Sequence, residues 1–457
     1  MRGQSSVPAM GTAAARAVLG TLFGDPGARA FDVRYWDGTV EKGGADPAPF
    51  TFVPRSAGAL KRMLLPPSEL KLGEAYVRGD VDVEGDLEAA ASLADGVRAR
   101  LASPARLARL ARQVLALPGG ASAEAPAPRR TRHGLPRHRH SRARDRAAVR
   151  SHYDVGNDFY SLWLDRNMVY SCAYFATGTE DIHAAQEAKL EHICRKLRLA
   201  PGERLLDIGC GWGGLVRWAA ARHGVEALGI TLSERQAALA NERIRAEGLE
   251  RRCRVEVRDY RDLPGDALFD KVVSVGMFEH VGRSQLPTYF RHAARLTRPG
   301  GLFLNHGIVR APERDAGLVS RVRRALWRQG RFIDRYVFPD GELVPLDVAV
   351  HDAEAAGFET RDVESLREHY AITLRHWVRR LEQARDAVEA LVGAQAYRVW
   401  RLYMAASAYA FRVGKLSLAQ VLLGRPDASG RVAIPATRDD LYAPAPRITA
   451  PQHGAAA

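Results

Sequence analysis

The stretch LLDIGCGWGG, residues 205–214, decides the fold class of this chain. Its first half is an apolar run of the kind that forms a buried strand, and its second half is a loop of closely spaced glycines. Glycines at such a point let the backbone approach a ligand and turn sharply into the following helix. We therefore expect a strand, a ligand-binding loop and a helix in this order.

Strands and helices alternate on the carboxyl side of this loop. VEALGIT, CRVEVRD, FDKVVSVG and GGLFLNHGIV are predicted strands, and GLVRWAAARHG and SERQAALANERIRAEG are predicted helices. Strands that alternate with helices of about 10 to 15 residues are typical of a doubly wound, mostly parallel sheet, so the predicted fold class is α/β. From Pro339 onward we expect added helices. One is expected in residues 396–423, whose apolar side chains favour a place in the core over contact with a lipid chain.

The composition is that of a globular protein with an anionic partner. Of the 457 residues, 46% are hydrophobic and 26% are charged. The net charge of +14 favours nucleic acid or an anionic membrane as partner, although an arginine-rich composition bias would give the same excess.

No apolar run reaches the length of about 18 residues that a membrane span needs, and no secretory leader is recognisable. The four cysteines form no Cys-x-x-Cys pair, which favours a reducing, cytosolic setting.

The chain divides into five predicted segments. Residues 1–30 are small and weakly patterned, and we expect them to be frayed. Residues 31–115 predict a small N-terminal α+β domain, in which Asp37-Gly38 between alternating runs indicates a hairpin. Residues 116–150 are rich in Pro, Gly, Ala and Arg and are typical of a linker. Residues 151–425 form the large α/β domain, and residues 426–457 form a tail.

The linker contains histidines and arginines. His133, His138 and His140 lack a fixed scaffold and matching acidic or cysteine partners, so we expect no metal site. The arginines of residues 129–150 could bind phosphate groups of an anionic surface or could simply keep the linker solvated. The sequence does not separate these two interpretations.

The glycine loop is compatible with two classes of nucleotide cofactor. Gly209, Gly211 and Gly214 match the dinucleotide fingerprint Gly-x-Gly-x-x-Gly. However, Asp207 lies before the loop, and no acidic residue stands about 20 residues further on, where a ribose-binding carboxylate is expected. The form Asp-x-Gly-x-Gly-x-Gly resembles the first motif of class I S-adenosylmethionine-dependent methyltransferases. We therefore expect a methyltransferase rather than a dinucleotide-binding protein.

Five separated blocks extend this resemblance. They are HYDVGNDFYSLWLDRNMVYSCAYF (152–175), LLDIGCGWGGL (205–215), GITLSERQ (229–236), DYRDLPG (259–265) and VSVGMFEHVG (273–282). In order and spacing they resemble the cyclopropane-fatty-acyl-phospholipid synthase family, together with the mycolic acid cyclopropane synthases. The resemblance covers residues 150–425, and residues 31–115 look like the smaller N-terminal domain of the longer, phospholipid-acting members.

The resemblance implies methyl transfer from S-adenosylmethionine to a cis double bond of an acyl chain, through a carbocation that loses a proton to bicarbonate and closes a cyclopropane ring. By motif match, the residues that hold bicarbonate would be Cys172, Glu279, His306, Ile308 and Tyr370. Those that hold S-adenosylmethionine would be Tyr170, Ser171, Asp207, Gly209, Gly211, Gly213, Thr231, Gln236, Asp259 and Tyr260. His280 has no implied role beyond a structural hydrogen bond.

Each catalytic candidate also has a structural explanation. Cys172 could be a small core thiol, His306 the end of a strand and Tyr370 an interface side chain. Their joint placement at the carboxyl ends of strands, where open α/β sheets bind ligands, favours the functional interpretation. The chain departs from the family around His306, because Asn305 and Gly307 stand where Leu and Thr are more common.

Three functions stay open from the sequence. The first is a cyclopropane-fatty-acyl-phospholipid synthase that acts on unsaturated phospholipid chains, cytoplasmic and peripheral at the inner face of an anionic membrane. The second leaves a 10-methylene branch, which a partner reductase would convert into a methyl branch. The third is a non-catalytic basic protein that binds lipid or RNA, although no nucleic-acid module is visible and no specific nucleic acid is expected. For the oligomeric state, we consider a homodimer.

Overall fold

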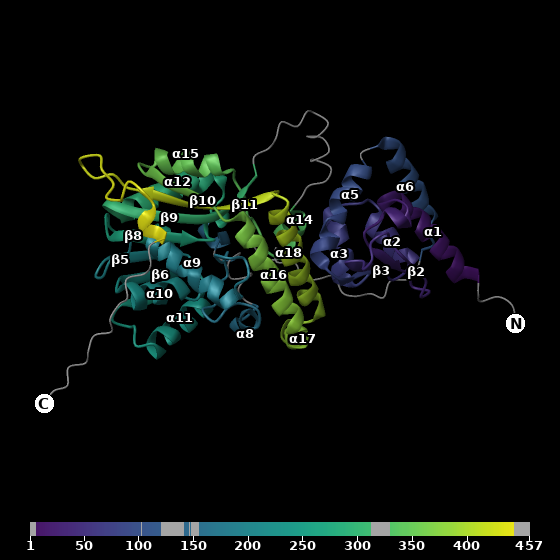
Figure 1. The fold of residues 1–457 in the computed structure, drawn as a ribbon, viewed down its shortest axis with the longest axis horizontal. Coiled ribbons are helices and arrows are strands. Elements are labelled where there is room, and N and C mark those ends of the chain that lie inside the picture. The colour runs from purple at the N-terminus through teal and green to yellow at the C-terminus, as the bar shows by residue number, and fades with distance from the viewer. Residues whose placement is uncertain are drawn as a thin grey trace.

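The computed structural model describes residues 6–101, 103–119, 141–145, 147, 155–311 and 330–442. Figure 1 shows two units side by side, a larger one that contains a broad sheet and a smaller N-terminal one. The long helices α16 (Arg367–Gln383) and α18 (Ala394–Arg412) stand between them. Within the described ranges, no helix combines the length and apolar character that crossing a membrane requires.

The larger unit is built around a seven-stranded sheet with the order β10-β11-β9-β8-β5-β6-β7. Its strands are β5 (Arg204–Ile208), β6 (Glu226–Thr231), β7 (Cys253–Val257), β8 (Phe269–Val275), β9 (Thr297–Arg310), β10 (Glu359–Ser365) and β11 (Leu416–Gly424). Neighbours from β9 to β7 pair in parallel, whereas β11 runs antiparallel to both β9 and β10. Strand order reverses between β5 and β8, which is the switch point of a doubly wound sheet.

Helices cover both faces of this sheet, and Figure 1 shows α12 and α15 above it and α10 and α11 below it. The covering helices are α9 (Ile182–Lys196), α10 (Gly214–His223), α11 (Glu234–Ala246), α12 (Leu286–Leu296) and α15 (Leu346–Ala355). Val272 and Phe303 belong to one core, whereas the next residues, Val273 and Leu304, belong to the other, because successive strand residues point to opposite faces. The predicted α/β class with a mostly parallel sheet is confirmed.

The stretch 396–423, predicted to be helical, instead folds as a helix followed by a strand. Helix α18 ends at Arg412, and Gly414 adopts a φ of 72°, which turns the chain into β11. From Leu418 onward every residue of β11 is buried. A strand that is covered on both faces is apolar at nearly every position, so its sequence resembles that of a buried helix.

The N-terminal unit holds a four-stranded sheet with the order β2-β1-β3-β4. Its elements are α1 (Ser6–Phe23), β1 (Asp32–Arg34), β2 (Val40–Glu41), β3 (Phe50–Pro54), α2 (Ala57–Leu64), α3 (Glu69–Arg78), β4 (Val81–Gly85), α4 (Leu87–Ala91), α5 (Leu93–Arg100) and α6 (Pro104–Ala116). Strands β1 and β2 pair antiparallel across the Asp37-Gly38 turn, which confirms the predicted hairpin.

Helix α1 corrects the expectation that residues 1–30 are frayed. Ala15, Val18, Leu19 and Leu22 are fully buried, at the spacings of three and four residues that define one face of a helix. The sequence pattern is weak because alanine and glycine recur along the helix, although alanine itself favours a helix. The other predicted domain boundaries stay predictions.

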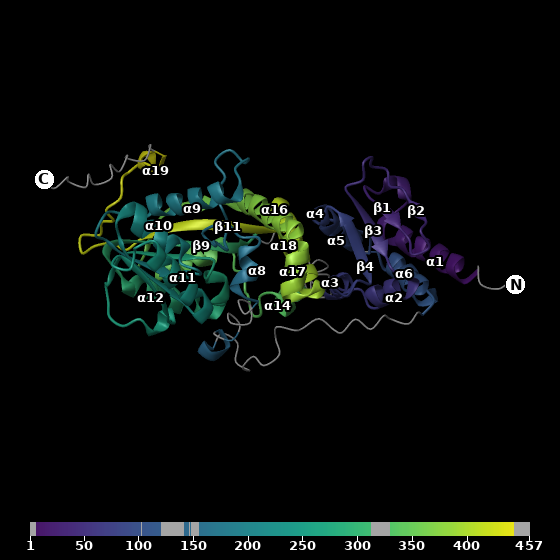
Figure 2. The same cartoon turned by 90° about the horizontal axis from the view of Figure 1, so that it is seen from below.

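Arg398 of α18 reaches into the N-terminal unit. Its guanidinium donates to both carboxylate oxygens of Asp82 and to the carbonyl oxygens of Tyr76 and Val81. It also lies 4.1 Å from the centroid of the Tyr76 ring, within the range of a cation–π contact. Figure 2 shows α17 (Arg385–Val392) and α18 beside α3 and α4, where these contacts form.

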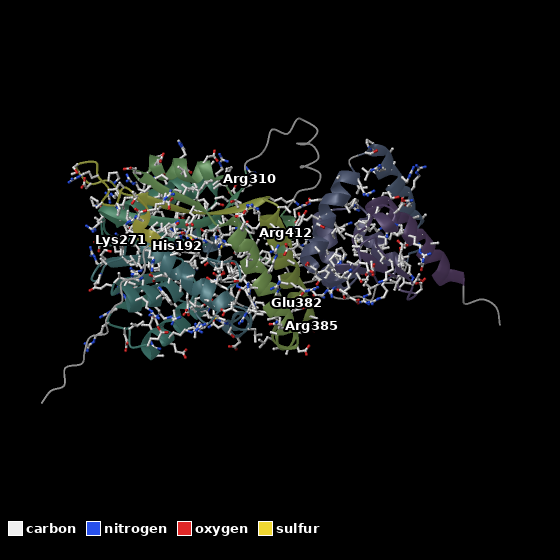
Figure 3. All side chains as sticks on the ribbon, viewed as in Figure 1. His192, Lys271, Arg310, Glu382, Arg385 and Arg412 are labelled. Atoms are coloured by element: carbon white, nitrogen blue, oxygen red, sulfur yellow. The ribbon has the colours of Figure 1, made fainter. Side chains whose placement is uncertain are left out.

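Further arginines extend this interface along the helix pair. Arg375 of α16 and Arg412 of α18 both donate to Glu88 at the start of α4. Arg401 binds Glu382 and the Tyr76 hydroxyl. In Figure 3, Arg412 and Glu382 lie toward opposite ends of the helix pair. The two units are therefore joined by charge-assisted hydrogen bonds over the length of α18.

Candidate active site

A cavity opens at the carboxyl ends of β5, β6 and β8, where open α/β sheets bind ligands. Nine of the ten predicted cofactor residues line it: Tyr170, Ser171, Asp207, Gly209, Gly211, Thr231, Gln236, Asp259 and Tyr260. The tenth, Gly213, caps helix α10 with a φ of 73°, and its neighbour Gly214 faces the cavity instead.

The glycine loop is held close to β6 and to the chain after β8. The backbone N–H groups of Gly209 and Cys210 both donate to the Ile230 carbonyl, at 2.9 and 3.0 Å. Gly209 has a φ of 83°, and a Cβ at this position would lie 2.9 Å from the Met277 side chain. No side chain fits there, so the loop presents bare backbone to the cavity, as close contact with a nucleoside requires.

Two buried polar atoms in the cavity walls lack a hydrogen-bond partner among the described residues. One is Asp207 Oδ1 at the end of β5, and the other is Gln236 Nε2 in the first turn of α11. The Thr231 hydroxyl donates to Gln236 Oε1 at 2.7 Å, which fixes the amide and leaves its NH₂ group available. A buried acceptor and a buried donor without partners indicate a polar ligand.

Asp259 and Arg261 form the polar wall that follows β7. Arg261 donates to both carboxylate oxygens of Asp259 and also to Asp145. Burial acts to raise the pKa of Asp259, but the Arg261 guanidinium outweighs it and holds the pKa below its usual range. Asp259 is therefore ionised at neutral pH and can accept hydrogen bonds from a ligand.

Part of the predicted linker lies against this wall. Arg142 pairs with Asp262 at 2.7 Å, and Arg144 donates to both carboxylate oxygens of Asp340, which lines the cavity. These two arginines are paired within the chain, and phosphate binding by the linker stays a prediction. Most of residues 129–150, with the three linker histidines, lies outside the described residues. The described part of the chain contains no group of histidine, cysteine and acidic side chains that could hold a metal ion.

The predicted anion-binding residues Glu279 and His306 do not line the cavity, although Met277 and His280 on either side of Glu279 do. Glu279 follows β8, and its Oε1 accepts from the backbone N–H of Ile308 in β9 at 2.6 Å. The Nε2 of Gln420 in β11 lies 3.1 Å from His306 Nδ1. Because an amide nitrogen only donates, Nδ1 accepts and the ring proton lies on Nε2. Glu279 Oε2 and His306 Nε2 are both buried and have no partner among the described residues.

Burial sets the protonation states of this pair. It raises the pKa of Glu279 to about 7, against the opposing effect of the Ile308 N–H. It also lowers the pKa of His306 far below its usual range, and Lys189 and Lys196 lower it further. At neutral pH the imidazole is therefore uncharged and can donate from Nε2, and Glu279 can gain or lose a proton readily.

Cys172 and Tyr370 meet at one carbonyl group. The Cys172 thiol lies 3.7 Å from the carbonyl oxygen of Leu366, which also accepts from the Tyr370 backbone N–H at 3.0 Å. Cys172 is fully buried, and burial raises the pKa of its thiol. The thiol is therefore a neutral donor rather than a reactive thiolate. The described contacts join this pair to each other but not to Glu279.

The sequence missed several residues of the cavity wall. Lys189 lines it from α9, although a lysine in a helix usually faces solvent and no motif marks this one. Trp212 and Met277 also line it, and their positions within the glycine loop and beside Glu279 could have suggested this. His280 lines the cavity too, and its expected structural hydrogen bond stays a prediction.

A ligand cavity at the switch point of this sheet, with β11 antiparallel, defines a protein with the class I methyltransferase fold. The mycolic acid cyclopropane synthase CmaA1, solved in complex with SAH and CTAB, matches with a TM-score of 0.57 and 33% identity over 61% of this chain and 98% of its own. The cyclopropane synthase MmaA2 from Mycobacterium tuberculosis matches with a TM-score of 0.56 and 31% identity over the same shares. A family model described as mycolic acid cyclopropane synthetase matches residues 140–421, and the chain belongs to this family.

Curated relatives agree with this assignment. A probable fatty acid methyltransferase from Pseudomonas putida is 42% identical over 90% of this chain and 95% of its own length. The cyclopropane-fatty-acyl-phospholipid synthase of Escherichia coli K12 is 38% identical over 62% of this chain and 69% of its own length. A model for a domain of unknown function matches residues 18–94. The predicted family, fold and enzyme class, an S-adenosylmethionine-dependent methyltransferase, are confirmed.

Proposed function

We propose that this protein transfers a one-carbon unit from S-adenosylmethionine to a cis double bond of an unsaturated phospholipid acyl chain and forms a cyclopropane ring. The proposal is carried by two buried atoms that lack a partner among the described residues, Glu279 Oε2 and His306 Nε2, together with a cavity that is lined by the glycine loop and by Met277 and His280. The E. coli relative named as a cyclopropane-fatty-acyl-phospholipid synthase supports the reaction, and the SAH in the CmaA1 complex supports the cofactor.

The cavity fits the proposed cofactor. S-adenosylmethionine, when bound, supplies an electrophilic methyl group. The unpartnered Asp207 Oδ1 and Gln236 Nε2 offer an acceptor and a donor for its polar groups, and the glycine loop leaves room for its nucleoside. The apolar side chains of Trp212, Leu215 and Met277 keep water away from the reacting carbon, which protects a carbocation on the acyl chain from capture.

The new methyl carbon must also lose a proton to a base that is held in place. The Nε2–H of His306 is a buried donor without a partner among the described residues, and the carboxyl group of Glu279 can share a proton. Such a set fits a small oxyanion that carries a hydroxyl group. We propose bicarbonate, which would supply the base, with Cys172, Glu279, His306, Ile308 and Tyr370 as the residues that hold it.

A second product is favoured by the relatives' names. The Pseudomonas putida relative and a Mycobacterium tuberculosis relative, which match 90% and 81% of this chain, are both named probable fatty acid methyltransferases. A 10-methylene branch, later reduced to a methyl branch by a partner enzyme, would arise from the same first cation. Loss of a methyl proton from that cation closes the ring, whereas a shift of hydride from the methyl-bearing carbon to the cationic carbon, followed by loss of a methyl proton, gives the methylene branch. The position of the base decides whether the proton leaves before or after the hydride shift, and a shift of about 1 Å is enough to change the outcome.

Lipids from cells that express this protein alone test the proposal. The cyclopropane and the 10-methylene products are isomers, so mass spectrometry detects either one and proton NMR tells them apart. High-field cyclopropane methylene signals are the expected result. Signals of an exocyclic methylene group would support the second product instead, and unchanged lipids would overturn both.

We also propose an anionic membrane surface as the place of action. The net charge of +14 complements such a surface, and binding to anionic vesicles should weaken as salt screens the attraction. Binding that is the same to neutral and anionic vesicles at low salt would contradict this. A cytoplasmic location at the inner face, a homodimer and a reductase partner stay predictions.

A further inference from the structure

Lys189 is a buried cation that no carboxylate neutralises directly. It lies on α9 with 1% of its surface exposed and lines the cavity. Its Nζ donates to the Ser171 hydroxyl at 2.9 Å, and among the described residues no ion pair joins it to an acidic side chain. Burial lowers the pKa of Lys189 to about 8, although the charges of Asp165 and Asp207 oppose this effect without forming an ion pair with it. An anionic ligand group would complete this site.

Asp207 presents the opposite charge from the neighbouring wall. Only 2% of it is exposed, and its Oδ1 has no partner among the described residues. Burial raises its pKa to about 7, and the nearby Lys189 charge opposes that rise. A cation and an anion that line one cavity without bonding to each other are complementary to a ligand that carries both charges.

The strand order of the sheet indicates which end of this ligand lies near which residues. Asp259 and Tyr260 follow β7, which lies two strands away from β5 and Asp207 in the order β8-β5-β6-β7. Two inter-strand spacings amount to roughly 10 Å, so Asp207 and Asp259 can contact different ends of one ligand. A ligand with a nucleoside at the Asp259 end would place its other end between Lys189 and Asp207.

We infer that Lys189 and Asp207 bind the amino-acid end of S-adenosylmethionine, with the Lys189 ammonium on the carboxylate and the Asp207 carboxylate on the α-ammonium. This inference rests on the proposed function and adds Lys189 as a binding residue. The hydrogen bond to Ser171 holds the Lys189 side chain in its place. Cys172, also close to Lys189, is not the counter-ion, because burial keeps its thiol protonated.

Four nucleosides test the assignment by calorimetry on the full chain. S-adenosylmethionine and S-adenosylhomocysteine carry both charged groups, decarboxylated S-adenosylmethionine keeps only the ammonium, and 5′-methylthioadenosine has neither. Lys189→Met should weaken binding of the first two by at least about tenfold and should leave the last two unchanged. Asp207→Asn should weaken every ligand except 5′-methylthioadenosine.

Lys196→Met is the matched control. Lys196 lies two turns further along α9 and is equally buried, but it pairs with Glu364 and Asp362 and does not line the cavity. Its loss should lower the melting temperature and leave the four affinities in their wild-type order. Lys189→Gln, which keeps a polar side chain beside Ser171, should show the same ligand selectivity as Lys189→Met.

Two results would overturn the inference. One is an equal loss of affinity for all four ligands in both Lys189 variants, which would mean that Lys189 acts through the fold. The other is wild-type affinity for S-adenosylhomocysteine in both variants. A wild-type protein that binds none of the four ligands would instead contradict the proposed cofactor itself, so the two failures are distinguishable.

Discussion

Asp207 and Glu279 are buried carboxyl groups, one at the end of β5 and the other in the turn after the neighbouring parallel strand β8. Burial raises the pKa of each to about 7, from ordinary values of 3.8 and 4.5. Their surroundings differ, because the Lys189 charge opposes the effect of burial at Asp207, whereas Glu279 accepts a single backbone hydrogen bond from Ile308. We therefore assign Asp207 to holding a charged ligand and Glu279 to handling a proton.

Replacing Glu279 tests the second assignment. Glu279→Gln keeps the shape of the side chain but removes its ability to take or give a proton. We expect turnover to fall by at least about a hundredfold, because general acid–base groups contribute factors of this size. The affinity for S-adenosylhomocysteine should be unchanged, since Glu279 is absent from the cavity lining. Normal lipid modification by this variant would refute the role of Glu279.

The affinity for S-adenosylhomocysteine should depend on pH in both directions. The ionised form of Asp207 is lost as pH falls through about 7, and the ammonium of Lys189 is lost as pH rises through about 8. Affinity should be highest between these values. The other titratable groups near Lys189 are Asp165, Cys172 and His306, and the last two are uncharged throughout this window.

The matched ligand for this titration is 5′-methylthioadenosine, whose affinity should stay flat because it carries neither charged group. Lys189→Met should remove the alkaline limb of the profile for S-adenosylhomocysteine and keep the acidic limb. A profile in wild-type protein that is flat from pH 6 to pH 9 would show that neither side chain binds the ligand.

At the scale of elements, the sequence identified those parts that carry a periodic signal or a glycine spacing. Strands β5, β6, β8 and β9 were predicted because turns and amphipathic helices bound them. Strand β11 was missed because burial on both faces removes the alternation of apolar and polar residues. The glycine loop was found from its spacing, whereas Lys189 was missed because only tertiary packing makes a helical lysine a buried one.

The departures around His306 are explained by the element that packs against β9. A Cβ on Gly307 would lie 2.8 Å from the Phe278 ring, so glycine is required at this position. Asn305 accepts from the Tyr289 hydroxyl at 2.9 Å, which satisfies a polar side chain inside the core. The sequence flagged both positions but could not supply the neighbours that accommodate them.

Gly307→Ala should therefore impair the reaction. The new methyl group would displace Phe278 and, with it, the short turn Phe278–His280 that carries Glu279. We expect a destabilisation of about 1–3 kcal/mol and a loss of turnover, measured by urea denaturation and by product formation. Gly20→Ala in α1 is the control, because nothing lies within 4 Å of its Cβ position.

A smaller side chain opposite Gly307 should relieve the clash. The double variant Gly307→Ala with Phe278→Leu is expected to recover part of the turnover, because the shorter side chain leaves room for the methyl group. If Gly307→Ala alone is as active and as stable as the wild-type protein, the close packing of Phe278 on β9 does not position Glu279.

At the scale of the whole molecule, charged side chains bridge the two units. The sequence predicted an N-terminal domain and a large α/β domain but gave no sign of how they meet. From the sequence alone, the arginines of α16 and α18 indicate an ordinary solvated helix face. Their acidic partners lie about 300 residues earlier in the chain, as with Arg398 and Asp82 or Arg412 and Glu88. Pairings at such separation are set by tertiary structure alone.

Arg398→Ala should weaken this interface more than any change in an exposed ion pair. It removes the hydrogen bonds to Asp82, Tyr76 and Val81 together and leaves the half-buried Asp82 carboxylate with fewer donors. We expect the free energy of unfolding to fall by about 2–4 kcal/mol in urea denaturation, because breaking one side of a partly buried charge pair leaves the other charge uncompensated. The N-terminal unit should then lose its structure at a lower urea concentration than the sheet of the larger unit.

Arg385→Ala supplies the comparison, because Arg385 on α17 pairs with Glu389 one turn away on the same helix and is largely exposed (Figure 3). Exposed pairs of this kind contribute about 0.5 kcal/mol or less, so this variant should unfold like the wild-type protein. Equal destabilisation by Arg398→Ala and Arg385→Ala would mean that the interface contributes nothing beyond surface charge. A selective effect of Arg398→Ala would show that α18 couples the N-terminal unit to the helices that pack beside the catalytic sheet.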